Sequence, residues 1–370
     1  MNNYYVGLIS GTSMDGVDTV IAEITSEKVK TLAFKTFPYP NDLLAELKSL
    51  QKPASNEVYR LGKNDRNVGK HFADCVNALL AETNLKPADI TLVGSHGQTV
   101  RHHPNGDSGF SVQLGDANTI ASMTNIDVVA DFRKKDIALG GQGAPMVPAF
   151  HKAVFADERE SRVVLNIGGI ANITYLPANE PNNVMGFDTG PGNGLMDAWC
   201  KLHTGKEYDD NGQWAATGQC HYPLLKSLLS LPYFKSQAPK STGQEQFNLE
   251  WLQQLLMVQA EELSPEDVQA TLVHLTSTSI ADQVKALDKV DAVYVCGGGA
   301  HNGQLMQALA DALPNVKITN TQEIGISPDA VEAIAFAWLA YAYEHDLPGN
   351  VPAVTGASRE AVMGGLFKAK

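Results

Sequence analysis

One carboxylate in a glycine-rich segment is the best candidate for catalysis in this sequence. Asp188 lies within residues 186–193 (GFDTGPGN), after two strand-like residues and before a rigid turn. A carboxylate held in a loop by such a turn can accept a proton from a bound water or hydroxyl. The alternative is an Asx turn or a helix cap, since a helix is expected to begin at Gly194. The position of Asp188 between two glycine elements favours the catalytic interpretation.

Three glycine elements are candidates for phosphate binding. Residues 11–18 (GTSMDGVD) and the pair Gly168-Gly169 each join two strand-like runs, and residues 297–299 (GGG) lie between an apolar strand and a helix. Backbone N–H groups in such turns, and at a helix N-terminus, suit an anion. Each could also be an ordinary turn or bulge. Two such turns facing each other could clamp a polyphosphate, which suggests a nucleotide in a cleft between two related lobes. The segment 297–299 does not follow the GxGxxG pattern, which disfavours a dinucleotide fold.

Three further side chains are candidates for contacts to a small polar substrate. His96 lies in the donor-rich segment 95–103, which we expect to be a loop after a strand at 90–94. Arg133 is expected at the end of the strand 126–130 and could bind a carboxylate through two N–H groups, or form a surface salt bridge. Glu332 is expected in the first turns of a helix, where it could complement the helix dipole or reach a ligand hydroxyl. The histidine spacing in 95–103 matches no common zinc pattern, so a metal site there is disfavoured.

The elements that must position these residues indicate an α/β protein. Strand-like runs alternate with helical patterns such as 41–50 and 56–80. A length of 370 residues favours two domains. We place the boundary in the loop-like stretch 131–148 and give no place on a sheet to 204–263.

Composition narrows the class of partner and compartment. The net charge of -13 disfavours nucleic acid and anionic lipid. The four cysteines are scattered, without CxxC or Cys/His pairs, which favours reduced thiols in a cytoplasm. We expect no signal peptide, because no basic leader precedes an apolar stretch, and no membrane span, because the apolar run 333–343 is too short.

Several of these segments together resemble the anhydro-N-acetylmuramic acid kinase family. The resemblance runs in order along nearly the whole chain. The segments that carry it are 11–18 (GTSMDGVD), 95–99 (SHGQT), 140–145 (GGQGAP), 166–172 (NIGGIAN) and 186–193 (GFDTGPGN).

The resemblance implies a fold and a domain division. The family belongs to the actin, hexokinase and heat-shock ATPase superfamily. Its fold implies two related α/β lobes of the actin-like ATPase (ribonuclease H-like) type with ATP in the cleft. The lobes would be residues 1–135 and 136–345, with the tail 346–370 packing back on the first.

The resemblance also implies an activity, in cell-wall (peptidoglycan) recycling. Water would open 1,6-anhydro-N-acetylmuramic acid at the anomeric carbon, and the released 6-oxygen would take the γ-phosphoryl group of ATP. The products would be N-acetylmuramic acid 6-phosphate and ADP. Asp188 matches the family's general base, and a homodimer is implied.

Site residues follow from the same resemblance. His96, Arg133 and Glu332 are the expected contacts to the sugar. ATP would come with Mg²⁺. Ile9 and Asn166 stand where many members of the superfamily carry Asp, so no metal ligands are assigned. The residues expected to bind ATP are Gly11, Thr12, Ser13, Met14, Asp15, Gly16, Val17, Asp18, Gly168, Gly169, Gly297, Gly298 and Gly299.

Two alternative functions remain open on the sequence. A conventional hexose or amino-sugar kinase of the same superfamily would use Asp188 to deprotonate a substrate hydroxyl. An ATP-driven binding or filament protein would turn over ATP without sugar. The donor-rich segments 95–103 and 140–145 suit a small polar ligand better than a peptide or a second subunit.

Overall fold

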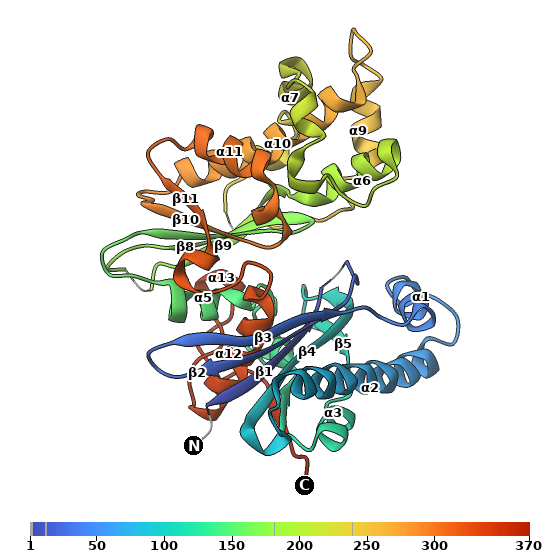
Figure 1. Ribbon diagram of the computed structural model, residues 1–370, viewed down its shortest axis with the longest axis vertical. Helices are drawn as coiled ribbons and strands as arrows, with labels where there is room; N and C mark the ends of the chain where they lie inside the picture. Colours follow the sequence, from blue (N-terminus) through green and yellow to red (C-terminus); the bar gives the residue numbers. More distant parts are fainter. Residues whose placement is uncertain (1–2, 12, 181, 239) are drawn as a thin grey trace. The chain divides into compact units, whose positions relative to one another are not determined.

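A computed structural model describes residues 3–11, 13–180, 182–238 and 240–370 (Figure 1). The chain divides into two compact units. Unit 1 holds residues 1–154 and 330–370, and unit 2 holds residues 155–329. The segments 136–154 and 330–345 therefore pack with the N-terminal unit, whereas the sequence analysis grouped them with the second lobe. The assignment of the two units as ATPase lobes stays a prediction.

Unit 1 is built on a mixed sheet with strand order β12-β6-β4-β1-β2-β3, and β5 pairs with β4 outside this path. Strands β1, β2 and β3 form an antiparallel meander, while β4 is parallel to both β1 and β6. The C-terminal strand β12 pairs with β6, so the end of the chain completes this sheet. The strands are β1 Tyr4–Ser10, β2 Val17–Ile24, β3 Val29–Phe37, β4 Ile90–His103, β5 Phe110–Leu114, β6 Val128–Ala130 and β12 Gly365–Phe367.

The helices of unit 1 close its core. They are α1 Asn41–Leu50, α2 Glu57–Thr83, α3 Ala117–Thr124, α4 Phe132–Ala138, α5 Val147–Phe155, α12 Val331–Glu344 and α13 Pro352–Thr355. Helix α2 presents its buried residues to the same core cluster as β1 and β4. The apolar run expected to form a buried helix is α12, and its residues 333–342 are all buried.

Close contact between α12 and the sheet requires two glycines. A Cβ on Gly7 of β1 would lie 1.9 Å from the carbonyl oxygen of Ala333, and one on Gly94 of β4 would lie 2.0 Å from that of Phe336. These distances are far below van der Waals contact. The glycines therefore bring the backbone of α12, whose first turn carries Glu332, directly onto β1 and β4.

Unit 2 repeats the strand arrangement of unit 1. Its sheet has the order β11-β10-β7-β8-β9, again with an antiparallel meander (β7, β8, β9) followed by strands β10 and β11 parallel to the first. The shared order and directions confirm two related α/β lobes, and the order is the one expected of the ribonuclease H-like type. The strands are β7 Arg162–Ile167, β8 Ile170–Leu176, β9 Met185–Pro191, β10 Ala292–Cys296 and β11 Lys317–Asn320.

The helices of unit 2 include the segment that sequence reasoning left unplaced. Helices α10 and α11 lie along one side of the sheet (Figure 1), and α10 contacts α6, α7 and β9. The chain between 204 and 263 forms α7, α8 and α9 and packs into the core of this unit through residues such as Leu224, Leu228 and Leu252. The helices are α6 Asn193–Thr204, α7 Tyr222–Leu228, α8 Pro232–Lys235, α9 Leu249–Leu256, α10 Pro265–Lys285 and α11 Gly303–Ala312.

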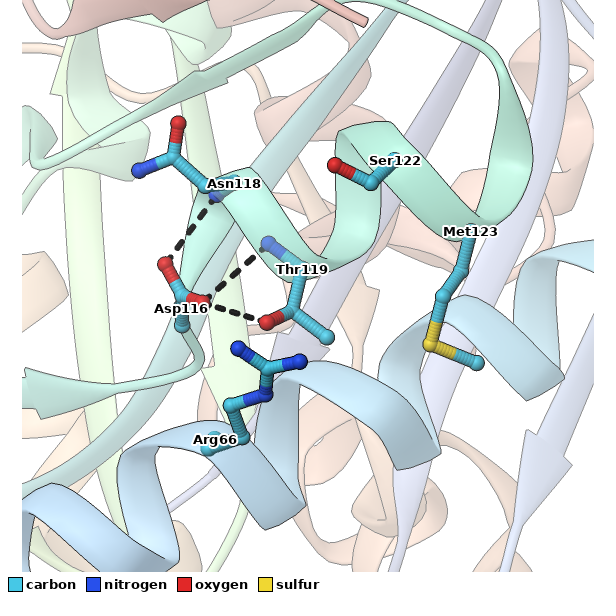
Figure 2. A pocket seen from close by; sticks show the side chains of 6 residues that line it. All are labelled: Arg66, Asp116, Asn118, Thr119, Ser122 and Met123. Carbon is cyan, nitrogen blue, oxygen red and sulfur yellow. Dashed lines mark hydrogen bonds between the residues drawn. The ribbon is translucent and has the colours of Figure 1, made fainter.

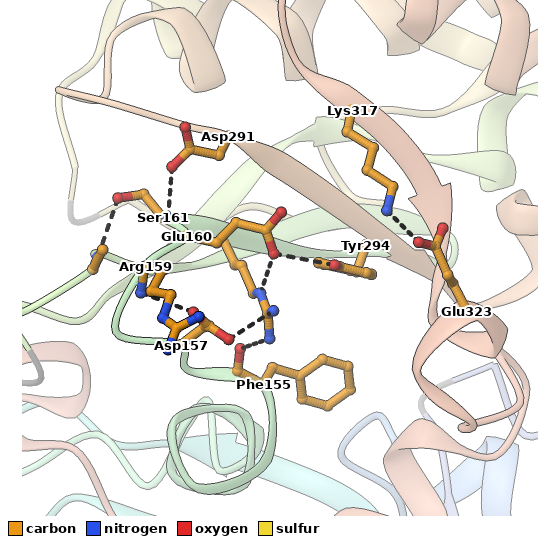
Figure 3. Close-up of polar contacts among 11 residues, drawn as sticks. Phe155, Asp157, Arg159, Glu160, Ser161, Asp291, Tyr294, Lys317 and Glu323 are labelled. Atoms are coloured by element: carbon orange, nitrogen blue, oxygen red, sulfur yellow. Dashed lines mark hydrogen bonds and ion pairs between the residues drawn. The ribbon is translucent and has the colours of Figure 1, made fainter.

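The beginning of unit 2 is fixed by polar contacts around the first residue of β7. Arg162 donates to Oε2 of Glu160 at 2.6 Å, to Oδ2 of Asp157 at 3.1 Å and to the Phe155 carbonyl oxygen at 2.9 Å. Figure 3 shows Asp157, Glu160 and Tyr294 in this network, where the Tyr294 hydroxyl donates to Glu160 at 3.3 Å. The network ties β7 to β10 at the end of the sheet where β7 begins.

Three local expectations were wrong. Residues 95–103 belong to strand β4 and not to a loop, because the antiparallel pairing with β5 extends the strand to His103. Arg133 lies in helix α4 and not at a strand end. Asp188 lies inside strand β9 and not in a loop, opposite Asn172 of β8.

Candidate active site

The first glycine turn connects β1 and β2 in unit 1. The carbonyl oxygen of Gly11 accepts hydrogen bonds from the Met14 N–H at 3.2 Å and from Nε2 of Gln98 at 3.1 Å. The Ser10 hydroxyl donates to the Gly16 carbonyl at 2.7 Å across the turn. The turn is thus fixed by the chain around it. Thr12, one of the expected ATP contacts, lies outside the described residues.

The members of this turn differ in what they can offer a ligand. The side chains of Met14 and Val17 are buried in the core of unit 1, so only their backbone could contact a phosphate. Ser13 and Asp15 are exposed, and the Ser13 hydroxyl donates to Oδ1 of Asp15 at 3.1 Å. Asp18 accepts from the Thr36 hydroxyl at 2.6 Å.

His96, Arg133 and Glu332 are brought together in unit 1. Nε of Arg133 donates to Nε2 of His96 at 2.9 Å, and the His96 ring packs on Phe336 of α12 with a centroid distance of 4.7 Å. Burial, and then the charge of Arg133, hold the pKa of His96 well below its usual range, so its ring is neutral. Burial lowers the pKa of Arg133 to about 10, while Glu332 and Asp136 oppose this shift. The guanidinium is still charged at neutral pH.

Glu332 links this group to the first glycine turn. Burial raises the pKa of Glu332, and the charges of Asp18 and Asp15 raise it further, while Arg133 lowers it. Glu332 is therefore acted on both by Arg133 and by two carboxylates of the first glycine turn.

The loop 139–146 is held by a buried carboxylate. Oδ2 of Asp136 accepts from the Gly143 N–H at 2.8 Å, and Oδ1 accepts from Asn350 Nδ2 at 2.9 Å and from the Thr355 hydroxyl at 2.8 Å. The Gly143 carbonyl in turn accepts from Nη1 of Arg133 at 2.7 Å. Asp136 thereby fixes the loop that positions Arg133. Sequence reasoning did not select Asp136.

The second predicted glycine element, Gly168-Gly169, forms the turn between β7 and β8 in unit 2. The N–H groups of Gly192 and Gly194 donate to the Gly169 carbonyl at 3.1 and 3.2 Å, and that of Asn193 donates to the Gly168 carbonyl at 2.7 Å. The β7–β8 turn is therefore bonded to the first turn of α6.

The third glycine element lies against the same strand end. A Cβ on Gly297 would lie 2.4 Å from Oδ1 of Asn166, and one on Gly299 would lie 2.4 Å from Cγ2 of Ile167. Only glycine permits these approaches. The sequence analysis predicted both elements as parts of a nucleotide site, and they are neighbours.

Asp188 is partly buried on β9 under the segment that follows α8. Oδ2 accepts from the Thr242 N–H at 2.9 Å and from the Ser241 hydroxyl at 3.0 Å. The Asp188 backbone is fixed as well, since its N–H donates to the Lys240 carbonyl at 3.1 Å and its carbonyl accepts from the Tyr233 hydroxyl at 2.7 Å. Burial raises the pKa of Asp188, and the two hydrogen bonds to Oδ2 oppose that rise.

A row of polar residues crosses the sheet beside Asp188. Asn166 of β7 pairs with Asn172 of β8, and Asn172 pairs with Asp188 of β9. Residues directly opposite in neighbouring strands project to the same face. All three are partly exposed. The row therefore runs from Asp188 to the strand end that contacts Gly297, and the sequence signal that could have found it is the alternation of the strands.

One pocket in unit 1 lies away from the predicted site residues. In unit 1 a cavity of about 130 Å³ lies between α2 and α3, lined by Arg66, Asp116 and Thr119 among others, and it includes none of the predicted site residues (Figure 2). Within the described ranges, no three His, Cys, Asp or Glu side chains are grouped as a metal site. None of the helices in the described part of the chain is long and apolar enough to cross a membrane.

Comparison with known proteins gives the family. The two related α/β units, each with an antiparallel meander followed by parallel strands, define a two-lobed fold of the ribonuclease H-like type. The family model of anhydro-N-acetylmuramic acid kinase matches residues 3–369. The chain belongs to this family.

Curated relatives match over the full length. The anhydro-N-acetylmuramic acid kinase of Shewanella pealeana is 54% identical over 368 residues, which cover 100% of this chain and 99% of that protein. That of Shewanella oneidensis is 54% identical over 367 residues and covers 99% of each. Among solved structures, component A of the (R)-2-hydroxyglutaryl-CoA dehydratase of Acidaminococcus fermentans is 14% identical with a TM-score of 0.46, covering 92% of this chain and 98% of that one.

Proposed function

We propose that this chain is a kinase that opens 1,6-anhydro-N-acetylmuramic acid with water and phosphorylates the released 6-oxygen with ATP. The products are N-acetylmuramic acid 6-phosphate and ADP, in the recycling of cell-wall peptidoglycan. Family membership over residues 3–369 supports the reaction. The observation in this chain that supports the reaction is the partly buried carboxylate of Asp188, in which Oδ2 accepts two hydrogen bonds.

Asp188 is the proposed general base. It takes a proton from the water that attacks the anomeric carbon, while the bond from that carbon to the 6-oxygen breaks. The released 6-oxygen attacks the γ-phosphorus of ATP, and the bond from that phosphorus to the bridging oxygen breaks, so that ADP leaves with that oxygen. A base of this kind contributes about a hundred- to ten-thousand-fold in rate. Burial raises the pKa of Asp188, which makes it a stronger base, and the donors to Oδ2 oppose that rise.

ATP, with the Mg²⁺ ion that it carries, is the proposed phosphoryl donor. The residues proposed for its phosphates are the turn 11–18 in unit 1, and Gly168-Gly169 and 297–299 in unit 2. The support is geometric: each element follows a strand, and the two in unit 2 pack against the N-terminus of α6. Backbone N–H groups in such positions favour negative charge.

His96, Arg133 and Glu332 are the proposed contacts to the sugar. Arg133 uses Nε and one N–H of Nη1 for His96 and Gly143, so the remaining N–H groups of Nη1 and Nη2 suit a carboxylate approaching end-on. The acid group of the sugar substrate is such a ligand. Glu332, whose pKa is raised, suits a sugar hydroxyl.

ADP release with the anhydro sugar, with ordinary N-acetylmuramic acid and without sugar tests the proposal. We expect turnover that depends on the anhydro sugar. In heavy-oxygen water the label should appear at the anomeric hydroxyl of the product. Label-free product would indicate a conventional sugar kinase, and ATP turnover unchanged by sugar would contradict the proposal.

A homodimer in the cytoplasm that binds neither nucleic acid nor membrane is part of the same proposal. Sedimentation of the purified protein tests the dimer.

A further inference from the structure

Residues 240–247, here called the covering segment, lie over Asp188 in unit 2 and follow the short helix α8. Their sequence, KSTGQEQF, contains none of the glycine-rich signatures that identified the site. Thr242 and Ser241 provide both hydrogen bonds found to the Asp188 carboxylate among the described residues. The inference below rests on the proposed function of Asp188 as the base.

The covering segment is anchored from both sides. At its end, Phe247 is buried and packs on Tyr233 and Phe234 of α8, with ring centroids 5.6 and 5.5 Å apart. Within it, the Thr242 hydroxyl donates to Oε1 of Gln246 at 2.7 Å. These contacts hold the Thr242 N–H in place. The segment is therefore packed against α8 through Phe247, and Ser241 itself is exposed.

The same segment reaches the second glycine turn. Nε2 of Gln244 lies 3.0 Å from the position that a Cβ on Gly169 would occupy. One short stretch of chain thus lies next to both the proposed base and a proposed phosphate-binding turn.

Both hydrogen bonds end on the same carboxylate oxygen. Donors on Oδ2 fix the plane of the carboxylate and direct the lone pairs of Oδ1, which has no hydrogen bond among the residues that the structure describes. A general base needs one oxygen available to the water and a fixed orientation toward it. The arrangement supplies both.

We propose that Ser241, with the Thr242 N–H, is a positioning residue that holds Oδ2 of Asp188 so that Oδ1 receives the proton of the attacking water. Ser241 acts through Asp188 and does not itself touch the reacting atoms. The Ser241 hydroxyl also stabilises the ionised carboxylate. Two other titratable groups lie close by. The pKa of Tyr233 is raised by burial and by Asp188, and that of Lys240, whose Nζ donates to the Tyr233 carbonyl at 3.3 Å, is lowered by burial.

The test is the pH profile of kcat/KM for the anhydro sugar in Ser241→Ala. Losing a donor to the ionised form raises the pKa of Asp188, so the acid limb should move up by about half to one pH unit. Activity above that limb should fall by no more than about ten-fold, because the Thr242 N–H remains. Ser241→Thr keeps a hydroxyl and should restore the wild-type limb. Ser236→Ala is the matched control, because Ser236 is exposed and its hydroxyl donates to the carbonyl of Pro232, the first residue of α8, at 3.3 Å.

An acid limb that stays at the wild-type pH in Ser241→Ala overturns the inference, whatever happens to the rate. A second readout separates this failure from failure of the proposed function. NMR titration of the Asp188 carboxyl, assigned with Asp188→Asn in selectively labelled protein without ligands, should show the same upward shift in Ser241→Ala. An inactive wild type would contradict the proposed function, and the titration would still decide the inference.

Discussion

Nε of Arg133 donates a hydrogen bond to Nε2 of His96 at 2.9 Å, and this contact fixes the state of the histidine. A guanidinium has no acceptor, so Nε2 must accept and the ring is neutral with its proton on Nδ1. The charge of Arg133 and burial both act against a second proton. His96 therefore serves to orient Arg133, not to carry charge.

Replacing His96 should weaken sugar binding more than catalysis. In His96→Phe the Arg133 Nε loses its acceptor, and we expect KM for the sugar to rise at least about ten-fold, with a smaller fall in kcat. His96→Gln offers a carbonyl oxygen and should lose less. Steady-state kinetics from about pH 5.5 to 8 check both points, because the pKa of His96 lies well below its usual value near 6.5. A KM that titrates near pH 6.5 in the wild type and not in His96→Phe would contradict a neutral His96.

The buried carboxylate of Asp136 should stabilise the loop 139–146 and with it Arg133. All of its recorded partners are donors, so in Asp136→Asn an amide N–H₂ must face a donor. We expect a loss of about 1–3 kcal/mol in unfolding free energy, with a raised KM for the sugar. Asp346→Asn is the control, at an exposed residue of positive φ that Asn tolerates. Equal thermal midpoints for the two variants would show that the loop does not depend on Asp136.

The close contact of α12 with the sheet predicts opposite effects for two glycine substitutions. Gly94→Ala would put a Cβ 2.0 Å from the Phe336 carbonyl oxygen, so the helix must move away. We expect a loss of about 1–3 kcal/mol or more. Gly62→Ala, in the exposed interior of α2 with nothing within 4 Å, should stabilise by about 0.5–1 kcal/mol. Denaturant midpoints measure both, and a neutral Gly94→Ala would contradict the packing described.

Buried His151 makes stability depend on pH. Burial lowers its pKa to about 3, below the unfolded value of about 6.5. Below pH ~6.5 the unfolded chain therefore binds a proton that the folded chain does not. This residue then lowers the free energy of unfolding by about 1.36 kcal/mol for each unit by which the pH is lowered. Unfolding at several pH values between about 6 and 4 should give a shallower slope in His151→Gln than in the wild type. Parallel slopes would mean that His151 is not the group responsible.

Much of the scaffold could be predicted from the sequence because its patterns are local. The helix at 41–50 follows from leucines on one face, and the observed α1 has the same bounds. The glycine elements were predicted from their local pattern, a short glycine run at the end of a strand-like run. In unit 2, Gly297 and Gly299 approach the end of β7 so closely that a Cβ would clash there, and their role in binding a nucleotide stays a prediction.

The missed features depend on contacts between distant segments. Ser241 and Thr242 meet Asp188 across more than 50 residues, and Asp136 meets Asn350 and Thr355 across more than 200. A serine or an aspartate in a polar stretch has no periodicity that would mark such a partner. The sequence prediction ended strand β4 too early for a related reason, because the second half of this strand forms by pairing with β5.

The most direct test of the account is sugar-dependent ADP release by Asp188→Asn, with ATP binding measured in parallel. The amide keeps the shape of the side chain but cannot take a proton. The account predicts a folded protein that binds ATP as the wild type does and has lost nearly all turnover with the anhydro sugar. Retention of more than about a tenth of the wild-type rate would contradict the role of Asp188, given the usual size of general-base catalysis.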